Sequence, residues 1–164
     1  LAAEPSMDGR KLTEIIVKEF IASYPKSEMV TQSSIDLKVL AKVQEAADEL
    51  GELLAKAYKE RDFQMQGAIT DARIRSQGYD HPDYVDLSDF CGKLAVNLPS
   101  CAGIAKKVRD AVTECVVANS APHARVSASK GLSIYLPLGR VSPLYKNLDF
   151  AKIGWGTFLT SRTG

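Results

Sequence analysis

Motifs that identify common enzyme classes are absent from this 164-residue chain. It has no Gly-rich phosphate loop, no dinucleotide-binding fingerprint and no H-E-x-x-H zinc motif. Its three cysteines, Cys91, Cys101 and Cys115, are too few for a disulfide framework and are not spaced as zinc ligands. Uncharged runs such as residues 131–139 are far shorter than the ~20 residues that a membrane-spanning helix needs. The sequence therefore predicts no membrane span and contains no convincing active-site motif.

The composition is that of a folded domain. Hydrophobic residues make up 45% and charged residues 25% of the chain, so it can bury a core without disulfides or metals. The chain does not begin with Met, and its first residues lack the pattern of a signal peptide. Residues 1–5 are typical of the end of a helix and a turn. We therefore expect the chain to begin inside a longer protein.

Charge is unevenly distributed along the chain. Residues 1–99 hold 12 Lys/Arg and 17 Asp/Glu, whereas residues 100–164 hold 9 Lys/Arg and 3 Asp/Glu. A basic segment is one feature of nucleic-acid-binding proteins, but no Lys/Arg run here is interleaved with aromatic residues. We therefore interpret the acidic and basic segments as complementary parts of one fold, and not as evidence of a nucleic-acid-binding surface.

Apolar residues at helical spacing predict a mostly helical protein. The first helix follows Asp8 or Ser6 as its cap and ends before Pro25. Asp36 is predicted to cap a long second helix, residues 66–77 to form a third, and Asp86 to cap a fourth. Pro99 separates the fourth helix from a fifth that opens at Ser100 or Cys101. The apolar positions of the first, second, fourth and fifth helices are Leu12, Ile15, Ile16 and Phe20; Leu40, Val43, Ala47, Leu50, Leu54 and Ala57; Leu87, Phe90, Cys91, Leu94 and Leu98; and Ile104, Val108, Ala111, Val112, Cys115 and Val116.

Two segments read as strands. Residues 30–35 are β-branched and polar, and residues 131–137 alternate small or polar with apolar side chains and end at Pro137. Residues 119–129 are Ala/Ser-rich and predict an exposed loop. The C-terminal segment, with Leu148, Phe150, Trp155, Phe158 and Leu159, predicts one or two short helices that cover the core, with Trp155 buried over the second strand.

The thiols and histidines offer little catalytic chemistry. Cys115 and His123 are the nearest Cys/His pair, but eight residues and a helix end separate them, and Cys115 lies on an apolar face. Cys91 has the same buried, structural interpretation. Cys101 is the thiol most expected to be exposed, with its pKa lowered by the nearby helix N-terminus.

Two polar clusters match known site chemistries in part. Asp80, His81, Asp83, Asp86 and Asp89 offer oxygen ligands for Ca²⁺, but the segment lacks the EF-hand glycine and terminal Glu, and capping accounts for Asp86 and Asp89. Ser127 and Lys130 match the S-x-x-K motif, but that chemistry needs the Ser at the start of a helix, and this segment leads into a predicted strand. We therefore predict no metal and no cofactor.

Four stretches resemble the C-terminal portion of clostripain-family cysteine peptidases, in the caspase-like group. The final stretch is the most specific, since G-L-S-I-Y-L-P at residues 131–137 is similar to the family's G-L-S-I-Y-F-P. Departures are small, such as Ser88 for Tyr and Leu136 for Phe. The similarity covers nearly the whole chain, and the stretches are residues 5–7 with 12–17; residues 33–37; Asp71-Ala72-Arg73, Ser76-Gln77 and residues 84–90; and residues 131–137 with Tyr145, Leu148, Phe150-Ala151, Gly154-Trp155 and Phe158-Leu159.

The resemblance implies an α/β to mostly α fold. Residues 1–37 would hold the last helix and strand of a caspase-like core, and residues 38–164 a helical C-terminal domain with a small β element at residues 131–137. Family members cleave after Arg or Lys with a His–Cys dyad that precedes the matched region. Neither His81 nor His123 stands in the family's motif, so no catalytic residue is assigned. The implied partners are the N-terminal catalytic portion and a peptide substrate, and the implied location is secreted or periplasmic.

Two functions remain open from the sequence. In the first, the chain is part of a clostripain-like endopeptidase, is inactive alone and supports the catalytic sheet. In the alternative, the chain is a non-catalytic helical binding module that shares the family's C-terminal domain. The first function implies that the strand at residues 30–35 pairs only with the N-terminal portion and is an unpaired edge in the isolated chain.

Overall fold

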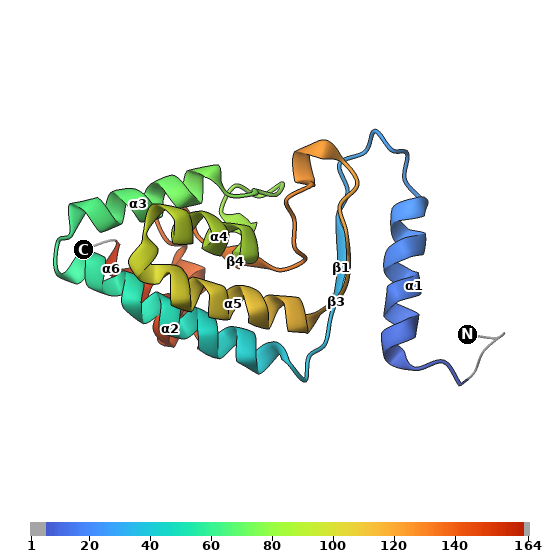
Figure 1. Cartoon of the computed structure of the whole chain (residues 1–164), viewed down its shortest axis with the longest axis horizontal. Helices are drawn as coiled ribbons and strands as arrows, with labels where there is room; N and C mark the ends of the chain where they lie inside the picture. The colour runs from blue at the N-terminus through green and yellow to red at the C-terminus, as the bar shows by residue number, and fades with distance from the viewer. Residues whose placement is uncertain (1–5, 163–164) are drawn as a thin grey trace.

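Helices dominate the protein, and the strands form two small antiparallel sheets (Figure 1). The computed structural model describes residues 6–162, apart from the side chains of residues 149 and 150. The predicted class, mixed and mostly helical, is confirmed. Within the described residues the elements are α1 (Gly9–Ala22), β1 (Gln32–Ile35), α2 (Leu40–Lys59), α3 (Phe63–Arg75), β2 (Tyr84–Asp86), α4 (Leu87–Asn97), α5 (Ala102–Cys115), β3 (Val116–Ser120), β4 (Ser133–Tyr135) and α6 (Gly154–Ser161).

Aspartate side chains cap three of the six α-helices in the described residues. The carboxylates of Asp8, Asp62 and Asp86 accept hydrogen bonds from backbone N–H groups in the first turns of α1, α3 and α4. The Asp62 cap starts α3 three residues before the predicted residue 66. Asp36 is not the cap of α2, as predicted; its carboxylate accepts from Lys38 N in a turn, and α2 begins at Leu40.

The core lies between α2 and the helices around it. The predicted stripe of α2 is buried, including Val43, Leu50 and Leu54, because these residues recur on one face of the helix. Helix α2 packs against α5 and α6, and α4 packs against α3 and α5. No helix in the described part of the chain is both long and apolar enough to cross a bilayer.

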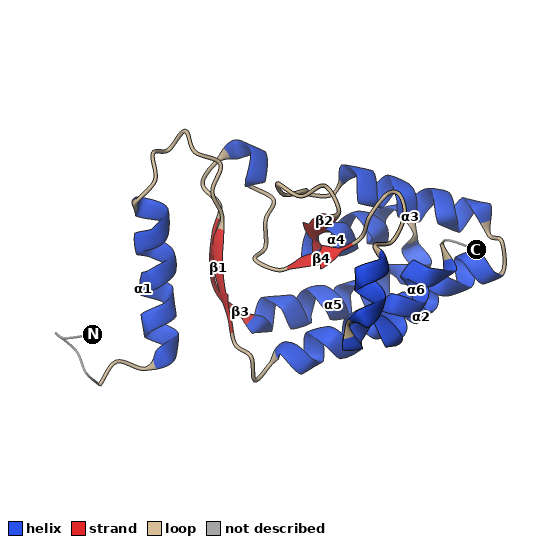
Figure 2. Ribbon diagram, turned by 180° about the vertical axis from the view of Figure 1, so that it is seen from behind, coloured by secondary structure: helices blue, strands red, loops and turns tan. Residues whose placement is uncertain are grey.

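Strands β1 and β3 form a two-stranded ribbon, with Gln32 opposite Ser120 and Ile35 opposite Val116. Two predictions are therefore wrong. Residues 30–35 are not an unpaired strand in this chain, and residues 119–129 are not simply a loop, because Asn119 and Ser120 belong to β3 and Val126 is buried. Figure 2 shows the ribbon between α1 on one side and the other helices on the opposite side.

The second sheet pairs β2 with β4, with Val85 opposite Ile134. The strand predicted at residues 131–137 is confirmed over its central part. The guanidinium of Arg73, from α3, donates hydrogen bonds to the carbonyls of Leu136 and Pro82, beside the ends of both strands. This buried cation joins α3 to the sheet.

Helix α6 closes the core against α2. The predicted burial of Trp155 is confirmed: its side chain is 5% exposed, and its Nε1 donates to the Tyr135 carbonyl at 2.9 Å. The two helices approach so closely that a Cβ on Gly51 would lie 2.5 Å from the Gly154 carbonyl carbon. Predictions about residues 1–5 and the Phe150 side chain lie outside the described residues.

Candidate functional site

The three thiols are buried in the hydrophobic core and do not form a reactive site. Burial raises the pKa of Cys91 to about 12 and also raises the pKa values of Cys101 and Cys115. The prediction for Cys101 is therefore wrong: its side chain is fully buried, and desolvation opposes the thiolate that a helix N-terminus would favour. The buried interpretation of Cys91 and Cys115 is confirmed.

Both histidines serve local turns. The Nδ1 atom of His81 accepts from Asp83 N at 3.3 Å, and Nδ1 of His123 accepts from Arg125 N at 3.1 Å. His123 stands before a short 3-10 helix, Ala124–Val126, as its cap. These contacts give each imidazole a structural role.

Asp86 is the centre of the acidic cluster. One of its oxygens accepts from Asp89 N, and the other accepts from the Tyr79 hydroxyl at 2.9 Å and from Lys130 N at 2.6 Å. Asp89 in turn accepts from Gln77 N and from the Lys93 ammonium. Protein donors thus use both carboxylates. Among the described side chains, no three of His, Cys, Asp or Glu are grouped as a metal ion would require.

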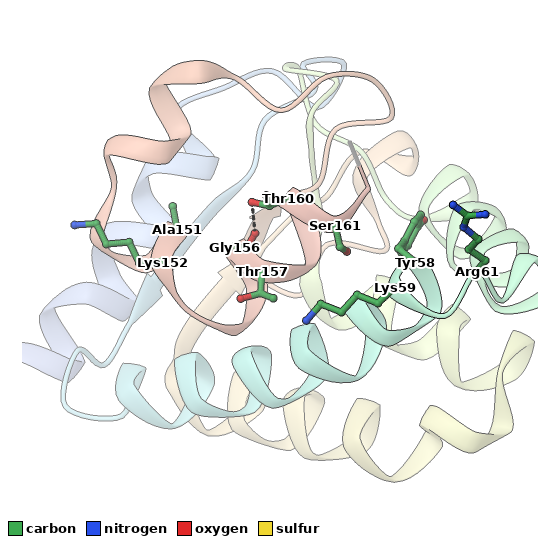
Figure 3. Close-up of a pocket in the computed structure, with 9 residues that line it drawn as sticks. All are labelled: Tyr58, Lys59, Arg61, Ala151, Lys152, Gly156, Thr157, Thr160 and Ser161. Carbon is green, nitrogen blue, oxygen red and sulfur yellow. Dashed lines mark hydrogen bonds between the residues drawn. The ribbon is translucent and has the colours of Figure 1, made fainter. Parts of the chain in front are cut away.

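A hollow of about 650 Å³ lies between the C-terminal end of α2 and α6 (Figure 3). Its cations do not converge: Lys59 extends towards Thr157, whereas Arg61 and Lys152 extend away on opposite sides. The Thr160 hydroxyl is occupied by a bond to the Gly156 carbonyl. Lys59 is also explained by its place in the last turn of α2, where a cation offsets the helix dipole. The hollow therefore lacks the converging groups of an anion site.

The outer face of α1 is the clearest candidate for an interaction surface. Only Val17 of this helix is fully buried, whereas the Ile16 side chain is 50% exposed and that of Phe20 36% exposed. Tyr24 extends the surface, because its ring lies 5.1 Å from the Phe20 ring. Helix α1 packs on the β1–β3 ribbon through its other side. We call Ile16, Phe20 and Tyr24 the outer face of α1.

Sequence periodicity found the apolar residues of α1 but not this division. The spacing of Leu12, Ile15, Ile16 and Phe20 predicts one apolar face, whereas in the structure Ile16 and Phe20 are exposed and Val17 is buried. The sequence feature that could have predicted this outer face is the spread of apolar residues around much of α1, because such a helix is usually covered on more than one side.

Comparison with family models, curated proteins and solved structures finds no match to this chain.

Proposed function

We propose that this chain is the C-terminal part of a clostripain-like cysteine endopeptidase that cleaves after Arg or Lys. In that enzyme, residues 1–37 complete the caspase-like core and the remaining residues support it from outside. The chain itself supplies no nucleophile or general base. Its task is to hold the catalytic sheet in place, because catalysis depends on fractions of an ångström in the placement of reacting groups.

The observation that carries the proposal is the outer face of α1. A helix that covers a sheet segment with one side and exposes Ile16 and Phe20 on the other resembles an element between two layers. Within residues 6–162 the β1–β3 ribbon beside it has two strands, which leaves backbone groups at its outer edges for further pairing. The resemblance of residues 5–7, 12–17 and 33–37 to the family's core is independent support.

The test compares the chain alone with the chain produced together with the segment encoded upstream of it. We expect no hydrolysis of fluorogenic Arg and Lys peptides by the chain alone and hydrolysis by the pair. Upstream sequence without a His motif and an Asp-Ala-Cys motif would overturn the proposal. Hydrolysis by the isolated chain that disappears in Cys101→Ala would also overturn it.

Interface variants then test the role of α1. Replacing Ile16 and Phe20 with Ser removes two apolar anchors worth about 1.5 kcal/mol or more each, so association with the catalytic segment should weaken about 100-fold. Val96→Ser is the matched control, because Val96 is 78% exposed on α4, away from α1. Equal effects of the two changes would contradict docking through α1. If the chain is instead a binding module without a catalytic segment, there is no association with an upstream segment for either change to weaken.

A further inference from the structure

An apolar cavity of about 340 Å³ lies between the first half of α2, strand β4 and the start of α6. Its walls include Val43, Ala47, Leu132, Tyr84, Tyr135 and Trp155. Its volume falls in the range of sites that bind small molecules, and at ~30 Å³ for each water-sized unit it holds about ten non-hydrogen atoms. It is separate from the outer face of α1 and from the hollow of Figure 3.

One charged group, the carboxylate of Asp48, lines this cavity among the described residues. Its Oδ1 accepts from Trp155 N at 3.1 Å, which fixes the side chain at the start of α6. Its second oxygen takes part in no hydrogen bond or ion pair within residues 6–162. The carboxylate is therefore held in position with one oxygen left to accept from a ligand.

The aromatic walls favour the same sign of ligand charge. Tyr135 lies between Tyr84 and Tyr145, with ring centroids 5.5 and 4.9 Å away. Ring faces attract cations, and this attraction strengthens where water is excluded. Burial, followed by the charge of Asp48, raises the pKa of Tyr145 to about 12, so the negative potential of Asp48 extends along the cavity wall.

We propose that this cavity binds a small organic cation with an apolar or aromatic body, whose amine or guanidine head contacts Asp48. A neutral molecule of the same shape would cover the carboxylate without replacing its water, at a cost in binding free energy. An anion would be repelled as well. The order of affinity is therefore cation, neutral molecule, anion.

Three phenyl compounds of similar size test this order on the intact chain: 2-phenylethylamine, 2-phenylethanol and 3-phenylpropanoate. Trp155 is the only tryptophan and lines the cavity, so its fluorescence reports binding directly. The amine should bind about tenfold more tightly than the alcohol. A difference of this size is expected from a modest ion pair together with a cation–π contact. The carboxylate should bind least.

Three variants, one of them a control, separate the effect of the Asp48 charge from that of the cavity itself. Asp48→Asn keeps an oxygen for Trp155 N and should make the amine and the alcohol bind equally. Glu49→Gln is the matched control, because it removes the same charge from the next residue of α2, where Glu49 pairs with Lys107; the preference should persist. Ala47→Leu fills the cavity and should abolish binding of both compounds, with thermal unfolding confirming that each variant folds.

Three results would overturn the proposal. The first is no saturable change in Trp155 emission with the amine. The second is equal binding of amine and alcohol to the unmodified chain. The third is a preference for the amine that survives Asp48→Asn unchanged. The docking proposal for α1 is unaffected by any of them, since the two sites share no residue.

Discussion

Replacing Gly51 with Ala should destabilise the protein, although the same change stabilises most helices. Gly51 lies within α2 where α6 crosses, and an added Cβ would meet the Gly154 carbonyl carbon and oxygen at 2.5 Å and Trp155 N at 2.6 Å. Carbon atoms in contact normally stay ~3.5–4 Å apart, so α6 would have to move by about 1 Å. Backbone atoms cannot rotate out of the way as a side chain can.

The magnitude follows from two opposing terms. Ala gains about 1 kcal/mol over Gly in a helix interior, whereas overpacking costs about 1–3 kcal/mol and more where backbone is struck. Moving α6 also loosens the buried side chains of Phe158 and Leu159. We expect a net loss of about 2 kcal/mol in the free energy of unfolding, which lowers Tm by roughly 4–8 °C for a chain of this size.

Gly67 supplies the matched control. It lies inside α3, and an added Cβ there would have nothing within 4 Å. Gly67→Ala should therefore raise the free energy of unfolding by about 0.5–1 kcal/mol. Urea and thermal unfolding followed by circular dichroism measure both variants. Gly51→Ala at least as stable as the unmodified chain would show that α6 does not cross α2 in this register.

Two further predictions concern buried groups. The folded protein at pH 8 should not react with a water-soluble thiol reagent, and three thiols should react after unfolding in urea. The pKa of Cys91 is raised from 9.0 to about 12 in the folded state. The contribution of Cys91 to stability is therefore complete below pH 9 and is lost as the pH rises towards 12. Fast labelling of Cys101 under native conditions would contradict its burial. Trp155→Ala should lower the free energy of unfolding by about 3–5 kcal/mol, and emission from Trp155 in the unmodified chain should be blue-shifted and resistant to iodide. A red-shifted, easily quenched emission would contradict its burial.

Prediction from the sequence succeeded where short-range physics decides the outcome. Asp8 and Asp86 cap helices because the acceptor and the N–H groups lie within three residues of one another. The α2 stripe and the burial of Trp155 follow from helical spacing in the same way.

Longer-range contacts were not predictable in this way. Strand β3 forms because β1, far earlier in the chain, lies beside it, and its polar Asn119 and Ser120 carry no local strand signal. The burial of Cys101 likewise depends on packing among helices rather than on its place near a helix N-terminus. The cavity that contains Asp48 draws its walls from α2, β4 and α6, so no single stretch of sequence reveals it.

The crossing of α2 and α6 has a consequence for folding during synthesis. The bond from Trp155 N to Asp48 joins residues 107 positions apart. At ~5–20 residues per second, a ribosome adds the second partner roughly 5–20 s after the first. During that interval the apolar stripe of α2 lacks one of its covers, while α3, α4 and α5 are synthesised in turn and become available to pack. The nascent chain is therefore most exposed to aggregation at the surface that α6 later covers, and chaperones that bind apolar segments would compete for this same surface.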